Sequence, residues 1–200
     1  MKKPSWFTLK RKAKSDRGAS LIEAALVMPL LILLAFGAAE FGFVFLDFLN
    51  VSSAAREGAR VGSAVGDATD ADTLILGAIA EATTDLDNST IEAVWIYKAQ
   101  ANGDPVDNCV IDNSTNFYKC IGPTNNTSIY DGSGNLLKGS WTSTGRKVTV
   151  GLNCPATPSE CPDRLGVRVV FTHQYITGFL KFPTGPFAED AVFQLEPDVG

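Results

Sequence analysis

The sequence predicts an α+β fold in which a long amino-terminal transmembrane helix continues into a domain with an antiparallel sheet of about four strands. The first observation is a long apolar run that begins at Ala24. The second is a set of later segments in which apolar residues alternate at every second position, as in half-buried strands. Helices packed on one face of such a sheet are a usual layered solution for an α+β domain. A chain of 200 residues without internal repeats has room for one such domain beside the helix.

The apolar run has the length and composition of a membrane span. No charged side chain occurs from Ala24 to Ala39, and apolar residues continue with few interruptions to Leu49. Crossing a bilayer takes about 20 such residues, so the stretch 24–46 suffices. Glu23 lies at the start of the run, where a charged carboxylate is costly unless something pairs with it.

Charge is divided unevenly between the two ends of the chain. Residues 1–18 carry seven basic side chains and one acidic one, a net charge of +6, which leaves −11 on residues 19–200 of a chain with net charge −5. Basic residues before a span favour a cytoplasmic amino terminus and an exported carboxyl-terminal domain. The lipid bilayer is therefore an expected partner, and the acidic exterior argues against nucleic acid.

The residues around the start of the run resemble those of type IV prepilins, in which a leader is cut after a glycine and a glutamate becomes the fifth mature residue. The segment RGASLIEAALVMPLL places Gly18, Ala19 and Glu23 in that order. Together with NVSSAAREGARVGSA and, more weakly, VFQLEP, this segment looks like the TadE-like minor pseudopilins of tight-adherence (Flp) pilus systems.

The resemblance implies a membrane-anchored component that takes part in assembly of a tight-adherence type IV pilus or a related secretion pseudopilus. Prepilin peptidase would cut between Gly18 and Ala19, and the new amine of Ala19 would supply a partner for Glu23. The implied parts are a cytoplasmic leader at residues 1–18, a transmembrane and stem helix at residues 19–66, and an exported globular domain at residues 67–200. The implied partners are prepilin peptidase, other pilins or pseudopilins, and inner-membrane pilus assembly proteins. The implied location is the bacterial inner membrane, with the domain outside the cytoplasm.

Two other interpretations of the run stay open. An apolar core from Leu21 to Leu34, followed by a small-x-small site within residues 35–39, would make an ordinary signal peptide and a soluble secreted protein. The run continues past that site, however, and Pro29 interrupts the core, which a spanning helix tolerates. A signal-anchored ligand-binding domain would need a pocket with convergent polar groups, which no motif here predicts.

The helix is expected to leave the membrane as a stem with a stripe of small residues. These recur at every fourth position, at Ala54, Gly58, Gly62 and Gly66. Such a stripe permits close approach of another element, so we expect packing at Gly58 and fraying at Gly66. After a turn-rich break, Thr69 or Asp70 can cap a short helix that runs to about Thr83 and packs on the sheet.

Alternating segments predict four strands, at residues 91–98, 146–152, 165–175 and 190–195. In the third, Val169 is expected to face the core and Arg168 to face away from it. The segment 101–140 is rich in Asn, Gly, Asp, Ser and Thr and is predicted to be irregular, apart from a hairpin turn at residues 131–135.

Four cysteines in an exported domain predict two disulfides, which allow three connectivities. Local pairing of Cys109 with Cys120 and of Cys154 with Cys161 is expected, because each bond would then close one loop. Zinc binding is the competing use, but neither spacing is a CxxC pair and His173 is the single histidine.

No catalytic motif is found, so neither an enzyme nor a cofactor is predicted. A Ser-His or Cys-His site would need His173, which lies in a strand pattern, and there is no phosphate-binding glycine loop. The carboxylates of Asp67, Asp70 and Asp72 suit a helix start better than a cation site. The aromatic segment 175–187 either covers the edge of the sheet or forms a contact surface.

Overall fold

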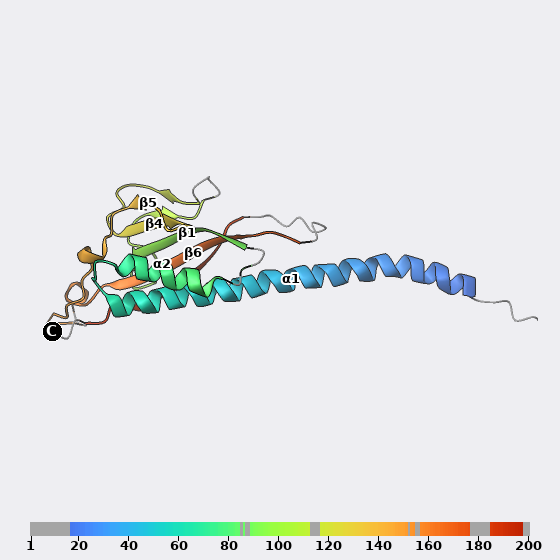
Figure 1. Cartoon of the computed structure of the whole chain (residues 1–200), viewed down its shortest axis with the longest axis horizontal. Coiled ribbons are helices and arrows are strands. Elements are labelled where there is room, and N and C mark those ends of the chain that lie inside the picture. The colour runs from blue at the N-terminus through green and yellow to red at the C-terminus, as the bar shows by residue number, and fades with distance from the viewer. Residues whose placement is uncertain are drawn as a thin grey trace, which may run out of the picture. The chain divides into compact units, whose positions relative to one another are not determined.

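The computed structural model describes residues 17–84, 86, 89–112, 117–151, 153–154, 157–176 and 185–197 of the chain. These residues form an α+β fold, as predicted (Figure 1). The helices are α1 (Arg17–Val65) and α2 (Ala71–Ala82), and the strands are β1 (Ser89–Lys98), β2 (Cys109–Val110), β3 (Lys119–Cys120), β4 (Thr127–Asp131), β5 (Leu136–Gly139), β6 (Arg164–His173) and β7 (Phe187–Gln194). The chain divides into two units, residues 1–39 and residues 40–200, which are described separately below.

The main sheet has five antiparallel strands in the order β5-β4-β1-β6-β7. The central strand β1 pairs Trp95 with Ile129 of β4 on one side and with Arg168 of β6 on the other. Strands β1, β6 and β7 confirm three of the predicted strands, with ends shifted by a few residues. Strands β4 and β5 were not predicted, although the hairpin turn that joins them was.

The predicted strand at residues 146–152 is wrong, because residues 146–151 form no strand and Leu152 lies outside the described residues. The backbone of this segment bonds to a loop instead of a neighbouring strand. Lys147 N–H donates to the Asp163 carboxylate, and Gly151 N–H donates to the Glu160 carbonyl. Arg146 and Val148 are buried. The alternation of residue types that predicted a strand is therefore caused by side chains of a loop that are buried at every second position.

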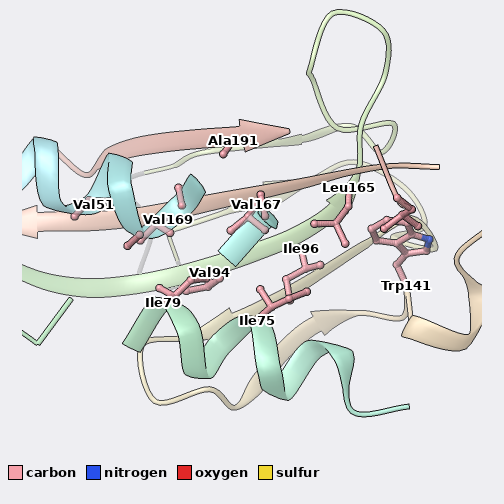
Figure 2. Close-up of a cluster of buried hydrophobic side chains, with 14 of the residues drawn as sticks. Val51, Ile75, Ile79, Val94, Ile96, Trp141, Leu165, Val167, Val169 and Ala191 are labelled. Carbon is pink, nitrogen blue, oxygen red and sulfur yellow. The ribbon is translucent and has the colours of Figure 1, made fainter. Parts of the chain in front are cut away.

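Apolar side chains fill the space between the helices and the inner face of the sheet (Figure 2). Ile79 and Ile75 of α2 lie beside Val94 and Ile96 of β1. Val51 of α1 closes the same layer over Val167 and Val169 of β6. The predicted inward orientation of Val169 is therefore confirmed. Burying one such side chain stabilises a fold by about 1.5–3 kcal/mol, so this layer is the main source of the domain's stability.

The outer face of the sheet carries a second apolar cluster. It is built around Trp95, Tyr97 and Val170, and the ribbon formed by β2 and β3 packs against it. Arg168 lies over the rings of Trp95 and Tyr97, at 5.1 and 5.7 Å from their centroids. Ala93, Trp95 and Tyr97 are buried on this face, whereas Val94 and Ile96 are buried on the inner face, so both sides of β1 are covered. Burial raises the pKa of the Tyr97 hydroxyl.

The stem part of α1 packs through its small residues, as expected for Gly58. A Cβ atom at Gly58 would lie 2.7 Å from Cγ1 of Ile79, and one at Gly62 would lie 2.8 Å from Cδ1 of Ile75. The helix ends at Val65, and Gly66 follows with φ of +56° and donates its N–H to the Gly62 carbonyl. Gly66 is thus a buried, left-handed helix terminator instead of a frayed end.

Candidate membrane anchor and assembly site

The amino-terminal part of α1 has the surface of a membrane-spanning helix. Among the described residues, α1 is the helix long and apolar enough to cross a membrane, and none of its apolar window is buried. The exposed side chains include Leu21, Ile22, Leu26, Val27, Met28, Leu30, Leu31, Ile32, Leu33, Leu34 and Phe36. A core helix of a water-soluble domain would have one face covered. The helix therefore fits a single-pass membrane anchor.

Two residues of the predicted cleavage and assembly site lie in the first turns of this helix. Gly18 is exposed, and no heavy atom lies within 4 Å of the position that a Cβ atom would take. Glu23 follows it on the same helix and is also exposed. The side chain of Ala19 and the leader at residues 1–16 lie outside the described part of the structure. Cleavage after Gly18 and pairing of Glu23 with the Ala19 amine stay predictions.

A buried polar cluster, which the sequence did not predict, joins α1 to the sheet. Asp47 of α1 accepts a hydrogen bond from the hydroxyl of Ser89 at 2.7 Å, and its carboxylate lies 2.6 Å from Nδ1 of His173. Asp47 and His173 are both buried, so each supplies a hydrogen-bond partner to the other at a place that water does not reach. The cluster connects the start of β1 and the end of β6 to one position of the helix.

The cluster contains the residue types of a hydrolase triad but not its geometry. A catalytic histidine uses one ring nitrogen for the carboxylate and the other for the nucleophile. Here the Ser89 hydroxyl and the His173 Nδ1 atom both contact the same oxygen of Asp47. The Ser89 hydroxyl is also 3.4 Å from that Nδ1 atom, so carboxylate and hydroxyl lie at one ring nitrogen instead of at two. This arrangement supports a structural role for His173.

The cysteines form two local disulfides, Cys109–Cys120 and Cys154–Cys161. The first joins opposite positions of β2 and β3 and so closes the ribbon over the outer face of the sheet. The second closes the loop that contains the turn at residues 158–160. Both bonds follow the local pairing expected from the sequence.

Two arginine–aspartate pairs connect elements of the domain. One cleft of about 770 Å³ lies between the β2–β3 ribbon and β7, and its charged lining includes Arg168 and Asp190. These two side chains bind each other through two contacts of 2.6 and 2.5 Å. In the second pair, Arg146 binds Asp72, whose second oxygen accepts a 2.6 Å hydrogen bond from Tyr130. The Asp72 carboxylate is thus engaged in holding α2 on the sheet.

In the turn between β4 and β5, the carboxylate of Asp131 is hydrogen-bonded to residues of the same turn. Asp131 accepts hydrogen bonds from the backbone N–H groups of Ser133 and Asn135 and from the Asn135 side chain, at 2.8–3.0 Å. These bonds, led by the one from the Asn135 side chain, lower the pKa of Asp131. The geometry confirms the predicted hairpin turn.

Comparison with known families gives a match for the amino-terminal part of the chain. Residues 18–60 match the model of the TadE-like protein family. This segment is TadE-like. The matched TadE-like region begins at Gly18, contains Glu23 and the apolar part of α1, and ends in the stem at Arg60. The resemblance inferred from the sequence is therefore confirmed for residues 18–60, and it fits a pilus-associated, membrane-anchored protein. The weaker likeness at VFQLEP lies outside the matched segment. No curated protein and no solved structure matches the chain.

Sequence reasoning missed Asp47 and Ser89 as partners of His173. The available signals were a charged residue inside an apolar helix and a lone histidine in a strand. Because Asp47 and His173 are 126 positions apart, no local spacing connects them. In contrast, the TadE-like residues lie within one short segment, which is why they could be recognised.

Proposed function

We propose that the chain is a membrane-anchored minor pseudopilin that takes part in assembly of a tight-adherence type IV pilus or a related secretion pseudopilus. The observation that carries the proposal is the TadE-like match over residues 18–60, which contains the candidate cleavage site, Glu23 and the apolar helix. The exposure of the apolar side chains in residues 20–39 supports an anchor that remains in the membrane.

In this proposal the basic leader stays in the cytoplasm and the acidic domain lies outside the inner membrane. The net charge of +6 on residues 1–18 supports this orientation, since basic residues are retained on the cytoplasmic side. The two disulfides also support an exported domain, because disulfides persist in oxidising compartments.

The alternative of a soluble secreted protein meets a physical difficulty. A cut near Ala39 would leave the remainder of α1 in water, with Phe41, Phe45 and Leu49 all exposed. Large contiguous apolar patches are rare on soluble monomers, so this surface supports retention in a membrane.

In the proposed maturation, prepilin peptidase removes residues 1–18 and leaves Ala19 with a free amine. That amine lies one helical turn from Glu23, within reach of this carboxylate or of the corresponding one on a neighbouring subunit. The pair would allow Glu23 to remain in the apolar layer, because an unpaired charge there is costly. Other pilins or pseudopilins and inner-membrane assembly proteins would then be the partners.

Mass spectrometry of the mature amino terminus tests the proposal. The parent chain, expressed in a bacterium with a tight-adherence system, should begin at Ala19. Gly18→Leu should give a full-length, membrane-bound precursor, because the peptidase requires a residue without a side chain beside the scissile bond. A mature chain that begins near residues 38–40, with Gly18→Leu trimmed and released, would establish the signal-peptide alternative instead.

Replacing Glu23 separates insertion from assembly. Glu23→Ala should still insert and be cleaved, because it makes the segment more apolar, but it should lose crosslinks to pilus or pseudopilus partners. Removing one member of a poorly solvated ion pair typically costs about 3–5 kcal/mol, which is enough to abolish assembly. Glu23→Asp should be intermediate, since it keeps the charge but has a shorter reach. Normal assembly of Glu23→Ala at parental membrane levels would refute the pairing role.

A further inference from the structure

The part of α1 that belongs to the second unit is apolar over most of its circumference before it becomes polar. Between residues 41 and 49 the exposed large side chains are Phe41, Phe43, Phe45, Leu46, Phe48 and Leu49. At 3.6 residues per turn these side chains cover an arc of about 220°, and the buried residues Asp47 and Val51 lie in the remaining sector. A helix that packed against a single other helix would need only a narrow apolar stripe.

The surface of α1 changes its character after Leu49. The side chains of Ser53, Arg56 and Arg60 are exposed, and Arg60 pairs with Glu57 through a contact of 2.5 Å on the helix surface. Charged side chains of this kind require water or headgroups. The change from an apolar surface to a charged one therefore marks where α1 enters the aqueous phase.

The domain already lies beside α1 at the level of this change. Strand β6 runs next to the stem in the opposite direction, from Leu165 beside Gly62 to His173 beside Asp47 (Figure 1). Ile176 follows His173 by three residues, and 54% of its surface is exposed. The chain thus presents an exposed apolar side chain three residues after His173, whose ring contacts Asp47 in the part of α1 that has an apolar circumference.

We propose that the membrane-proximal end of the exported domain rests in the interfacial layer of the outer leaflet of the bilayer that α1 crosses. We call Phe45, Phe48, Leu49 and Ile176 the membrane-seating surface. This inference rests on the proposed membrane anchor. The apolar part of α1 extends from residue 24 to residue 49, longer than the about 20 residues that the hydrocarbon core requires. The excess belongs to the interface, where amphipathic elements bury their apolar side chains in the headgroup and acyl boundary.

Single-cysteine variants of the full chain test this inference. All four native cysteines are in disulfides, so an introduced thiol can be labelled selectively with an environment-sensitive fluorophore. Leu49→Cys and Ile176→Cys probe the membrane-seating surface. Val110→Cys on β2, where the side chain is 56% exposed, is the matched control in the domain, and Leu33→Cys is the control in the proposed span. The labelled chains are reconstituted in phosphatidylethanolamine–phosphatidylglycerol vesicles at a low protein-to-lipid ratio.

Labels at positions 49 and 176 should be quenched by nitroxide-bearing lipids and should lose most of the iodide quenching that the label at position 110 shows. Iodide quenching at positions 49 and 176 equal to that at position 110, with position 33 still quenched by lipid, would overturn the inference and leave the anchor intact. Shielding from iodide that disappears on dilution with lipid would also overturn it, because a second copy would then be the occupant. Iodide quenching at position 33 would instead overturn the anchor itself.

Discussion

Gly58→Ala tests whether the stem of α1 is held against α2 by close packing. The Cβ atom that this change adds would lie 2.7 Å from Cγ1 and 2.9 Å from Cδ1 of Ile79. Cγ1 is bonded to Cβ of Ile79, so its contact can be relieved only by rotating the whole side chain about χ1 or by shifting the backbone, and not by moving the terminal methyl group. Ile79 is itself buried in the inner apolar layer and has little room to move.

Two opposing effects determine how much Gly58→Ala changes the free energy of unfolding. Alanine is favoured over glycine within a helix by about 1 kcal/mol. Overpacking a well-packed core costs about 1–3 kcal/mol, and a 2.7 Å contact with an inner atom of the buried Ile79 side chain belongs in the upper part of that range. We therefore expect Gly58→Ala to lower the free energy of unfolding of the domain by about 1–2 kcal/mol. Gly77→Ala in α2 is the matched control, because nothing lies within 4 Å of its added Cβ atom. It should raise the free energy of unfolding by up to about 1 kcal/mol.

Urea unfolding of the full chain in detergent micelles measures both effects, with fluorescence of the buried Trp95 and Trp141 as the signal. A double replacement adds a second check. Ile79→Val removes Cδ1, one of the two atoms that Gly58→Ala would crowd, so its usual cost of about 0.5–1.5 kcal/mol should shrink in the Gly58→Ala background. If Gly58→Ala stabilised the domain as much as Gly77→Ala does, the close-packing argument would be refuted.

Two further changes test the loops and the edge of the core. Thiol alkylation should detect the cysteines only after reduction. Replacing the cysteines of either disulfide by serines should lower the free energy of unfolding by about 2–4 kcal/mol. A peptide linking Cys109 to Cys154 would contradict the local pairing. Arg146→Ala should lower the free energy of unfolding by about 3–5 kcal/mol, because Arg146 is buried, pairs with Asp72 and lies 4.9 Å from the centre of the Trp141 ring. A loss below about 1 kcal/mol in urea unfolding would show that the pair contributes little.

The helices and strands that the sequence predicted correctly are those with a long run of regularly spaced apolar residues. Both helices and the strands β1, β6 and β7 have runs of eight or more residues with one dominant period. Strands β4 and β5 have only five and four residues, and β5 is mostly exposed. Strand β4 pairs with β1, which is distant in sequence, and β5 pairs with β4 at the edge of the sheet, so β4 could not be placed in the sheet from local pattern.

The strand predicted at residues 146–152 was wrong for a related reason. Alternate burial of Arg146 and Val148 has the period of a strand, but their partners are Asp72, Trp141 and the core. The same reasoning applies to the candidate site. Gly18 and Glu23 lie in a local motif and could be named from the sequence, whereas the bond between Asp47 and His173 is a property of the folded domain.

The apolar exposed part of helix α1 ends at Leu49, and the buried residues of α1 from Val51 onward belong to the core of the domain. Val51, Ala54, Ala55 and Ala59 are fully buried, and together with α2 they cover the inner face of β6. A fragment that began at residue 67 would lose these residues and expose Ile75, Ile79 and Leu165 to water. Fully burying each of these side chains is worth about 1.5–3 kcal/mol, which together approaches the whole stability of a small domain. The stem is therefore a structural part of the domain as well as its connection to the anchor, so a force applied to the anchor acts directly on the core.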